Sequence, residues 1–351
     1  MNGNLFSFRA TAVAACLLLL SGMKLFSAES DYQLSDDGTV LERYLGSEES
    51  FVVPDGVKIV GDFAFEGCSS LTSLFLPESV KRIERSAFAG CSGLTSITVP
   101  ENVEEIGLYA FRNCSSLAEI VVAGNNSNFQ SIDGVLFSKD GKKLYKFPEG
   151  MKKDTFLIPE SVKTIEDEAL FKARLKSIEV AKNNPDFKSI NGVLFSKDGK
   201  TLIKLPEGSA RESYVVPDGV VTIEKDAFTN SASLTEVVLP DGVKTIGKWA
   251  FANCSSLKNI RVPDSVSKIG DNAFAGCVSL TSFVVPKGIE KIAEFTFGLC
   301  VSLEEIVVSE GVQKIEPYAF AKCEALTIRA PKESYAERFA KESKIRFEAI
   351  E

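Results

Sequence analysis

Hydrophobic positions recur along this chain with a fixed period of 23 residues. Counted from a proline at position zero, Val or Ile stands at positions three and six, and Ala-Phe at ten and eleven. A segment of the form Leu-x-x-Ile-x-Val then closes the unit, and its last four positions alternate between apolar and polar, which predicts a β-strand with one buried face. Because one such unit cannot bury its own apolar side, neighbouring units must stack around a continuous core. The pattern therefore predicts a solenoid.

Nine units of this kind follow one another, and a proline, which cannot donate to a β-ladder, ends the closing strand before most of them. Gly or Asn at position thirteen predicts a backbone with positive φ, where a short helical turn after Ala-Phe stops. We therefore expect an α/β repeat, a leucine-rich-repeat solenoid that forms a curved right-handed coil stack. The units begin at Pro54, Pro77, Pro100, Pro159, Pro217, Pro240, Pro263, Pro286 and Ser309. The Pro159 unit has Leu170 and Ala173 in place of Phe and Cys, which predicts a local bend or looser packing there.

Two spacings are longer than the period, and both contain the same additional segment. The insertions span about 124–156 and 182–214, and they carry Asp140-Gly141 and Asp198-Gly199 between apolar runs. An Asp-Gly pair in this setting favours a β-hairpin, so we predict inserted β-hairpins and a second possible contact region at their tips.

Both ends of the solenoid, which we place at 54–330, are expected to be capped. Residues 29–53 contain a third copy of the Asp-Gly segment and predict an N-terminal capping hairpin. Residues 331–351 predict a C-terminal cap with a short helix, because Tyr335 and Phe339 lie four apart on one face.

Residues 1–28 differ in kind from the repeats. Arg9 precedes an apolar run of about 11 residues and then small residues, an order that predicts a secretory signal peptide and is too short to span a bilayer. A lipobox-like Val-Ala-Ala-Cys ending at Cys16 is the alternative, with a lipid anchor at that cysteine. We therefore expect an exported protein, secreted or at the cell surface, with periplasmic or lipid-anchored forms as variants and no membrane span.

Composition narrows the possible chemistry. The chain has no histidine, which removes the commonest general base and the imidazole ligands of most catalytic zinc sites. A net charge of −8, without a cluster of Lys and Arg, argues against nucleic acid as a partner. We predict no enzymatic activity, no catalytic residue, no metal site and no cofactor.

Seven of the eight cysteines share position fourteen of the unit. Side chains stacked in register point the same way, so we expect a buried ladder of thiols in preference to disulfides or a metal site. These cysteines are Cys68, Cys91, Cys114, Cys254, Cys277, Cys300 and Cys323.

The repeated unit resembles the BspA-type leucine-rich repeat family. The resemblance rests on forms such as Ile269-Gly270-Asp271-Asn272-Ala273-Phe274-Ala275-Gly276-Cys277 and covers roughly residues 31–351. It implies a secreted or surface-exposed solenoid without a cofactor. It also implies contacts with proteins, including host extracellular-matrix and cell-surface proteins, and it carries no binding motif that could be transferred residue by residue.

The solvent side of the closing strands gives the candidate binding site. Strand alternation places one row of mostly apolar residues there, next to a polar row that contains Ser73, Asn259 and Glu305. The predicted binding row is Phe75, Thr98, Val121, Val238, Arg261, Val284 and Val307. An exposed apolar row can bind a protein segment, although Val and Thr also favour any pleated surface, and Phe75 and Arg261 are least explained by that preference.

The sequence thus predicts an exported, non-enzymatic, protein-binding solenoid that acts in adhesion or host contact. The alternative is a structural or assembly component of the cell envelope, and the oligomeric state stays open between the two. A carbohydrate-binding module would need exposed flat aromatic rings, and Trp249, the only tryptophan, lies beside the core position Phe251. That reading is therefore disfavoured.

Overall fold

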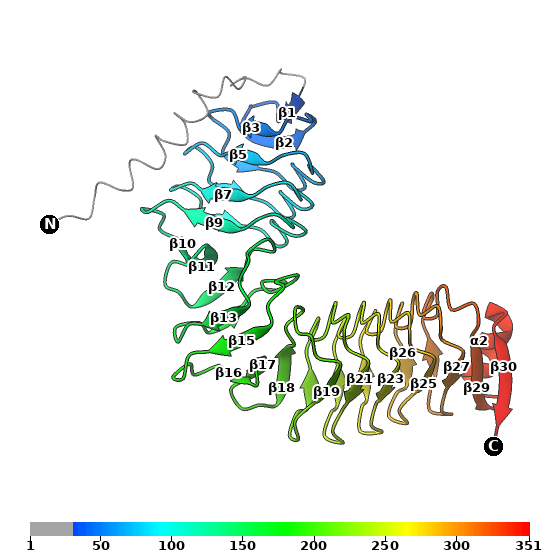
Figure 1. The fold of residues 1–351 in the computed structure, drawn as a ribbon. Helices are drawn as coiled ribbons and strands as arrows, with labels where there is room; N and C mark the ends of the chain where they lie inside the picture. Colours follow the sequence, from blue (N-terminus) through cyan, green and yellow to red (C-terminus); the bar gives the residue numbers. More distant parts are fainter. Residues whose placement is uncertain (1–30) are drawn as a thin grey trace. The chain divides into compact units, whose positions relative to one another are not determined.

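A computed structural model describes residues 31–351 as stacked coils in two compact units (Figure 1). Unit 1 comprises residues 31–152 and 161–173, and unit 2 comprises 153–160 and 174–351. The division runs through the coil that starts at Pro159, which is the unit with the weakest repeat sequence. The predicted signal peptide and Cys16 lie outside the described residues.

Each coil contributes two parallel strands, one short and one longer. The short strands, here called side strands, have two residues each: β4 (Ile59–Val60), β6 (Arg82–Ile83), β8 (Glu105–Ile106), β14 (Thr164–Ile165), β20 (Thr222–Ile223), β22 (Thr245–Ile246), β24 (Lys268–Ile269), β26 (Lys291–Ile292) and β28 (Lys314–Ile315). The longer ones, here called face strands, are the predicted closing strands: β3 (Ser50–Val52), β5 (Ser73–Phe75), β7 (Ser96–Val99), β9 (Glu119–Val122), β13 (Thr155–Ile158), β15 (Ser177–Val180), β19 (Ser213–Val215), β21 (Glu236–Val238), β23 (Asn259–Arg261), β25 (Ser282–Val284), β27 (Glu305–Val307) and β29 (Thr327–Pro331).

The segment between a side strand and the next face strand is a series of tight turns, and the predicted helical turn is absent from the described coils. The backbone has positive φ at position thirteen in all nine units, including Lys172, Leu299 and Lys322, where the sequence has neither Gly nor Asn. It also has positive φ at position nine, immediately before the Ala-Phe pair. Two left-handed residues four positions apart prevent a helix from forming. The α/β assignment is therefore wrong for the described coils, which form a β-solenoid.

The phenylalanines at position eleven form the centre of each core. Their rings stack face to face with centroid separations between 4.7 and 5.7 Å. The ladders are Phe65, Phe88 and Phe111 in unit 1, and Phe228, Phe251, Phe274, Phe297 and Phe320 in unit 2. Most of these rings are fully buried, as the period predicts.

The two insertions are three-stranded antiparallel meanders and not simple hairpins. The strands are β10 (Phe129–Ile132), β11 (Val135–Ser138) and β12 (Lys143–Lys146) in unit 1, and β16 (Phe187–Ile190), β17 (Val193–Ser196) and β18 (Thr201–Lys204) in unit 2. Two-residue loops at Asp133-Gly134 and Asn191-Gly192 add a turn that the prediction did not separate. The third strand pairs in parallel with a side strand, β12 with β14 and β18 with β20, and so joins the insertion to the stack.

The aspartate at each predicted hairpin tip is used to build its own turn. The Asp140 carboxylate accepts hydrogen bonds from the Ser138 hydroxyl at 2.7 Å and the Lys142 backbone N–H at 3.0 Å. These bonds lower the pKa of Asp140 to about 2. Asp198 and Asp37 repeat the arrangement. The conserved geometry explains why all three copies share the Ser-x-Asp-Gly pattern.

A buried ion pair follows the third strand of each meander. In unit 1, Lys146 Nζ lies 3.1 Å from Glu149 Oε1, and the Glu149 side chain is only 1% exposed. The same carboxylate oxygen accepts the backbone N–H of Asn113 at 2.9 Å. In an uninterrupted stack this N–H is bound by the next coil, as Gly90 N–H is bound by the Arg112 carbonyl at 2.7 Å. Glu149 therefore replaces the backbone acceptor that the insertion displaces. Lys204 and Glu207 form the corresponding pair in unit 2.

Each end of the stack carries elements that differ from the regular coils. Antiparallel β1 (Tyr32–Leu34) and β2 (Val40–Tyr44) join unit 1 through pairing of β2 with β4. At the other end, α2 (Tyr335–Ser343) and β30 (Arg346–Ile350) cover the last coil. The helix begins after Ser334, which caps it by accepting the Glu337 N–H, while Pro331 still belongs to β29. No helix within residues 31–351 is both long and apolar enough to cross a membrane.

Replacing Phe274 with Ala should lower the free energy of unfolding by roughly 3–5 kcal/mol, because a fully buried ring leaves a cavity in the middle of the ladder. Urea denaturation of the purified protein measures this change. Phe295→Ala is the matched control, since its ring is 36% exposed in the same unit and should cost about 1 kcal/mol or less. Equal effects of the two substitutions would contradict the core assignment.

Glu149→Gln should destabilise the protein by roughly 3–5 kcal/mol, because it leaves the Lys146 ammonium buried without a counter-charge. The comparison is Glu104→Gln, which breaks the exposed pair with Lys81 and should change stability by about 1 kcal/mol or less. Both are measured by denaturant unfolding at neutral pH. A neutral Glu149→Gln would show that the ion pair does not hold the insertion in place.

Candidate functional site

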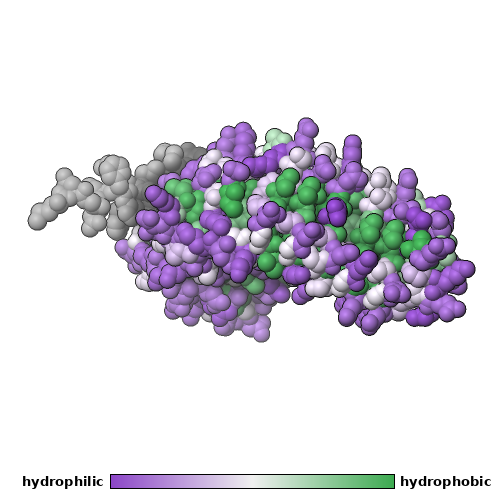
Figure 2. All heavy atoms as spheres, turned by 90° about the horizontal axis from the view of Figure 1, so that it is seen from below, coloured by the Kyte–Doolittle hydropathy of each residue, from purple (hydrophilic) through white to green (hydrophobic). Residues whose placement is uncertain are grey.

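The predicted binding row lies on the outer side of the face strands, where solvent reaches it. Phe75 is 38% exposed, Val121 39%, Val238 41% and Val284 63%, and Thr98 and Arg261 are also exposed. Val307 is only half-buried, beside Arg329 on the next strand. Ladder pairing brings Val238 opposite Arg261, and Val284 opposite Val307, in unit 2, and Thr98 opposite Val121 in unit 1. Exposed apolar residues lie among hydrophilic ones, as on the face that Figure 2 shows.

Two further residues belong to this row and were missed. Leu157 is 58% exposed and Val215 is 67% exposed, and both lie two positions before a repeat proline, Pro159 and Pro217. The signal was present, because Phe75, Thr98 and Arg261 have the same spacing to their prolines. It was overlooked because the insertions interrupt the 23-residue step.

A groove of about 560 Å³ opens in the row at Arg261. It follows a break in the sheet, since β19, β21 and β23 form one sheet while β25 starts another. Ile260 is half-buried there, although the equivalent Val237, Phe283 and Ile306 are at most 2% exposed. The break coincides with Phe283, the largest of these side chains, whose ring packs against Phe274 and Phe297.

The Arg261 guanidinium is the distinctive polar group of this groove. It makes no ion pair or hydrogen bond with any other residue in the described range 31–351. Asn259, Ser282 and Asp264 also line the groove, and Asp264 lies 3.9 Å from Lys287. The groove therefore places the partly exposed core residue Ile260 next to the unpaired guanidinium of Arg261. Phe75, the other residue that strand preference does not explain, also borders a break, because β5 and β7 belong to separate sheets.

Position nine carries a second set of exposed side chains, which the sequence analysis did not identify. Trp249 is 42% exposed, Phe295 36% and Tyr318 65%. Trp249 stands two residues before the fully buried Phe251 but is itself outside the core, since 42% of it is exposed. Phe295 and Tyr318 stack on each other with a centroid separation of 5.3 Å. The residue type at position nine varies from Ser86 to Trp249, so no periodic signal marked it.

The cysteines form a ladder in which each thiol binds the preceding coil. Six Sγ atoms, from Cys91 to Cys323, lie 3.1–3.2 Å from the carbonyl oxygen of a position-eleven Phe. Cys68 differs, because it is half-exposed. Burial raises the pKa of the Cys114, Cys254 and Cys300 thiols to about 12, which makes them poor nucleophiles at neutral pH. No group of three or more metal-binding side chains converges within the described residues.

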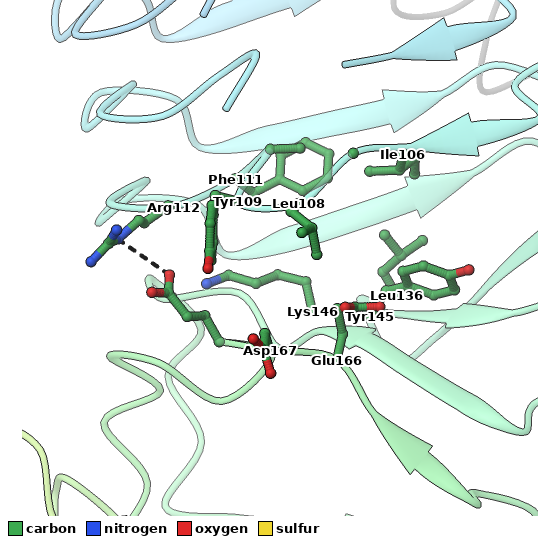
Figure 3. Close-up of a pocket in the computed structure, with 13 residues that line it drawn as sticks. Ile106, Leu108, Tyr109, Phe111, Arg112, Leu136, Tyr145, Lys146, Glu166 and Asp167 are labelled. Atoms are coloured by element: carbon green, nitrogen blue, oxygen red, sulfur yellow. Dashed lines mark ion pairs between the residues drawn. The ribbon is translucent and has the colours of Figure 1, made fainter. Parts of the chain in front are cut away.

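A small pocket in unit 1, of about 40 Å³, offers little room for a ligand (Figure 3). Tyr109, Arg112, Lys146 and Glu168 line it, and the charges are already matched. Arg112 Nε lies 3.2 Å from Glu168 Oε2, and Lys146 pairs with Glu149. The volume is about that of one or two water molecules, so the pocket is a structural ion cluster beside the insertion.

Alkylation of the folded protein with iodoacetamide at pH 8 should modify Cys68 and spare Cys254 and Cys300. With a pKa near 12, only about one thiol in 10⁴ is ionised at this pH, and burial also blocks access. Peptide mass mapping gives the modified positions, and guanidinium-unfolded protein serves as the positive control. The raised pKa favours the thiol form in the fold, so stability is complete below the unfolded value of 9.0 and declines as pH rises toward 12. Rapid native labelling of Cys254 would contradict the ladder.

Solved structures of other bacterial proteins share this fold. A leucine rich cell surface protein of Faecalibacterium prausnitzii is 25% identical, with 91% of this chain and 98% of that chain covered and a TM-score of 0.60. A leucine-rich repeat protein of Eubacterium ventriosum is 23% identical over 84% of this chain and 80% of that chain, with a TM-score of 0.58. The pneumococcal vaccine antigen PcpA is 21% identical over 93% and 84%, with a TM-score of 0.55. No curated protein matches the chain in sequence.

The family model of the BspA type leucine rich repeat region matches residues 44–153, 144–214 and 206–327. These ranges cover most of the chain, and they include both insertions as well as the regular units. The 23-residue step, the phenylalanine ladder and the face strands are the features that the match spans. The chain belongs to the BspA-type leucine-rich repeat family.

Proposed function

We propose that this chain is an exported, non-enzymatic solenoid that binds a protein partner along the binding row, in adhesion or host contact. The groove at Arg261 carries the proposal. It lies within the row, uncovers Ile260 and presents a guanidinium without a partner in the described chain. Arginine beside apolar surface is typical of the residues that dominate protein interfaces.

The geometry favours an extended partner segment that crosses the face strands. Val215, Val238, Arg261 and Val284 follow one another on successive coils, so one segment can contact several of them in turn. A carboxylate of the partner would pair with Arg261, while an apolar neighbour would cover Ile260 and Val284. Such a pair combines charge-assisted hydrogen bonding with burial of apolar surface.

Export and a binding role are supported by sequence and by the comparisons together. The apolar run after Arg9 has the length of the hydrophobic region of a signal peptide, and the Faecalibacterium protein of the same fold is a cell surface protein. The absence of histidine from the sequence and the high pKa of the buried thiols support a non-enzymatic role. Repeat solenoids present extended surfaces of this kind to partners.

Binding of the purified protein to an array of extracellular-matrix and host-surface proteins tests the proposal. We expect at least one ligand, and we expect Arg261→Ala to weaken it by roughly 30-fold in Kd, about 2 kcal/mol, as for hot-spot arginines. Phe75→Ala and Val284→Ser extend the test along the row. Glu324→Ala is the control, because Glu324 is exposed but lies outside the row.

Two outcomes would contradict the proposal. In the first, a ligand binds and every row variant retains its affinity while remaining folded. In the second, no soluble protein binds and sedimentation shows concentration-dependent self-association. That result favours the structural or assembly role, for which the outer edge of β30, the last strand of its sheet, is the available surface.

A further inference from the structure

The exposed aromatic side chains of unit 2 at position nine form a second surface, separate from the binding row. Trp249, Phe295 and Tyr318, here called the aromatic row, lie in the turn segment and not on the face strands. We infer that the aromatic row binds arginine or lysine side chains of a cationic protein segment.

The backbone at this position holds the rings in place. Trp249 has φ 58°, Phe295 51° and Tyr318 61°, a left-handed conformation that is uncommon for bulky residues. The Trp249 backbone N–H donates to the Asp271 carbonyl of the next coil at 3.1 Å, so the stack imposes the conformation. Because these large side chains are exposed at a left-handed position, they add little buried apolar area to the core. The left-handed conformation recurs at position nine in all nine units, so what distinguishes Trp249, Phe295 and Tyr318 is the exposed aromatic ring that each places there.

Unit 1 shows what a ring at position nine binds. The guanidinium of Arg85 lies 5.1 Å from the centroid of the Phe63 ring, and that of Arg112 lies 5.6 Å from the Tyr109 centroid. Both distances are in the range of a cation–π interaction. Arg85 also lies 3.3 Å from the Asp62 carboxylate, so the site combines a ring with an acid.

Unit 2 keeps the rings and lacks the cations. The position of Arg85, one coil after the ring, is taken by Asp271 after Trp249 and by Pro317 after Phe295. No guanidinium or ammonium group within residues 31–351 lies over any ring of the aromatic row. Glu294, next to Phe295, is exposed and makes no ion pair with the described chain. The ring faces and the acid are therefore open to a cation from outside.

The stacked pair defines where the cation sits. The rings of Phe295 and Tyr318 are nearly parallel, at 15°. One face of each ring therefore packs against the other ring, and the opposite face points away from the pair. Tyr318 is the most exposed at 65%. The net charge of −8 adds long-range attraction for a cationic segment. A partner with arginines spaced along an extended segment would contact Phe295 and Tyr318 on successive coils, and Trp249 two coils before Phe295.

The experiment uses a fluorescent synthetic peptide of about six Arg-Gly repeats, titrated with the full chain and followed by anisotropy. Trp249 is the only tryptophan, so its fluorescence reports contact at one end of the row. We expect Phe295→Leu and Tyr318→Leu each to weaken binding by about two- to fivefold, because leucine keeps apolar area but has no ring. The same peptide with citrulline in place of arginine should bind much more weakly.

Two variants separate this surface from the binding row and from bulk charge. Arg261→Ala should leave peptide binding unchanged, and so should Glu324→Gln, which removes an exposed acid elsewhere. If both leucine variants bind as tightly as the unmodified protein, the attraction is general electrostatics and the inference is overturned. Absence of any binding at physiological salt overturns it as well. Circular dichroism confirms that the exposed substitutions leave the fold intact.

Discussion

Everything in this fold depends on the register between neighbouring coils. Six of the position-eleven phenylalanine carbonyls accept a thiol from the next coil as well as a backbone N–H from their own: Phe65 O receives Cys68 N–H at 3.2 Å and the Cys91 thiol at 3.1 Å. The rings stack at about the same step, so a shift of one residue would break both the polar and the apolar contacts. This coupling explains why so strict a period is kept and why the cysteines face inward. It also fixes which side chains line up on the outside.

Periodicity revealed the features that are carried by a recurring residue type, and missed those that are carried by backbone conformation or by a local change in side-chain size. The units, the phenylalanine core and the exposure of most residues in the predicted row follow from apolar positions such as Phe274 and Val238, whose burial or exposure is set by the repeat. The left-handed conformation at position nine could not be predicted from the sequence. It is fixed by a hydrogen bond from the backbone N–H to the next coil, and any residue type with a backbone N–H can make that bond. The break between β23 and β25 could not be predicted either. It coincides with the large Phe283 ring, which packs against both Phe274 and Phe297. The first strand of each meander was not separated from the second, because the two-residue turns at Asp133-Gly134 and Asn191-Gly192 lie within the apolar run that precedes the predicted Asp-Gly tip.

The two exposed surfaces differ in chemistry as well as place. The binding row is apolar with one unpaired cation at Arg261, which suits a partner that brings a carboxylate. The aromatic row is rich in π-electrons and borders the acid Glu294, which suits a partner that brings cations. A solenoid can carry both because side chains at each repeat position are free to vary once the inner positions are satisfied. Specificity is then a matter of which outward positions change from coil to coil.

The buried lysine–glutamate pairs after the two meanders have a consequence for how such a chain can grow. Glu149 supplies the acceptor that an adjacent coil would have given to Asn113, so the inserted segment brings with it the means of repairing the interruption it causes. Lys204 and Glu207 form the same type of buried ion pair 58 residues later in the chain. A coil and its meander can therefore be duplicated together. The added copy would lengthen the stack without leaving a buried backbone N–H unsatisfied where the insertion interrupts it.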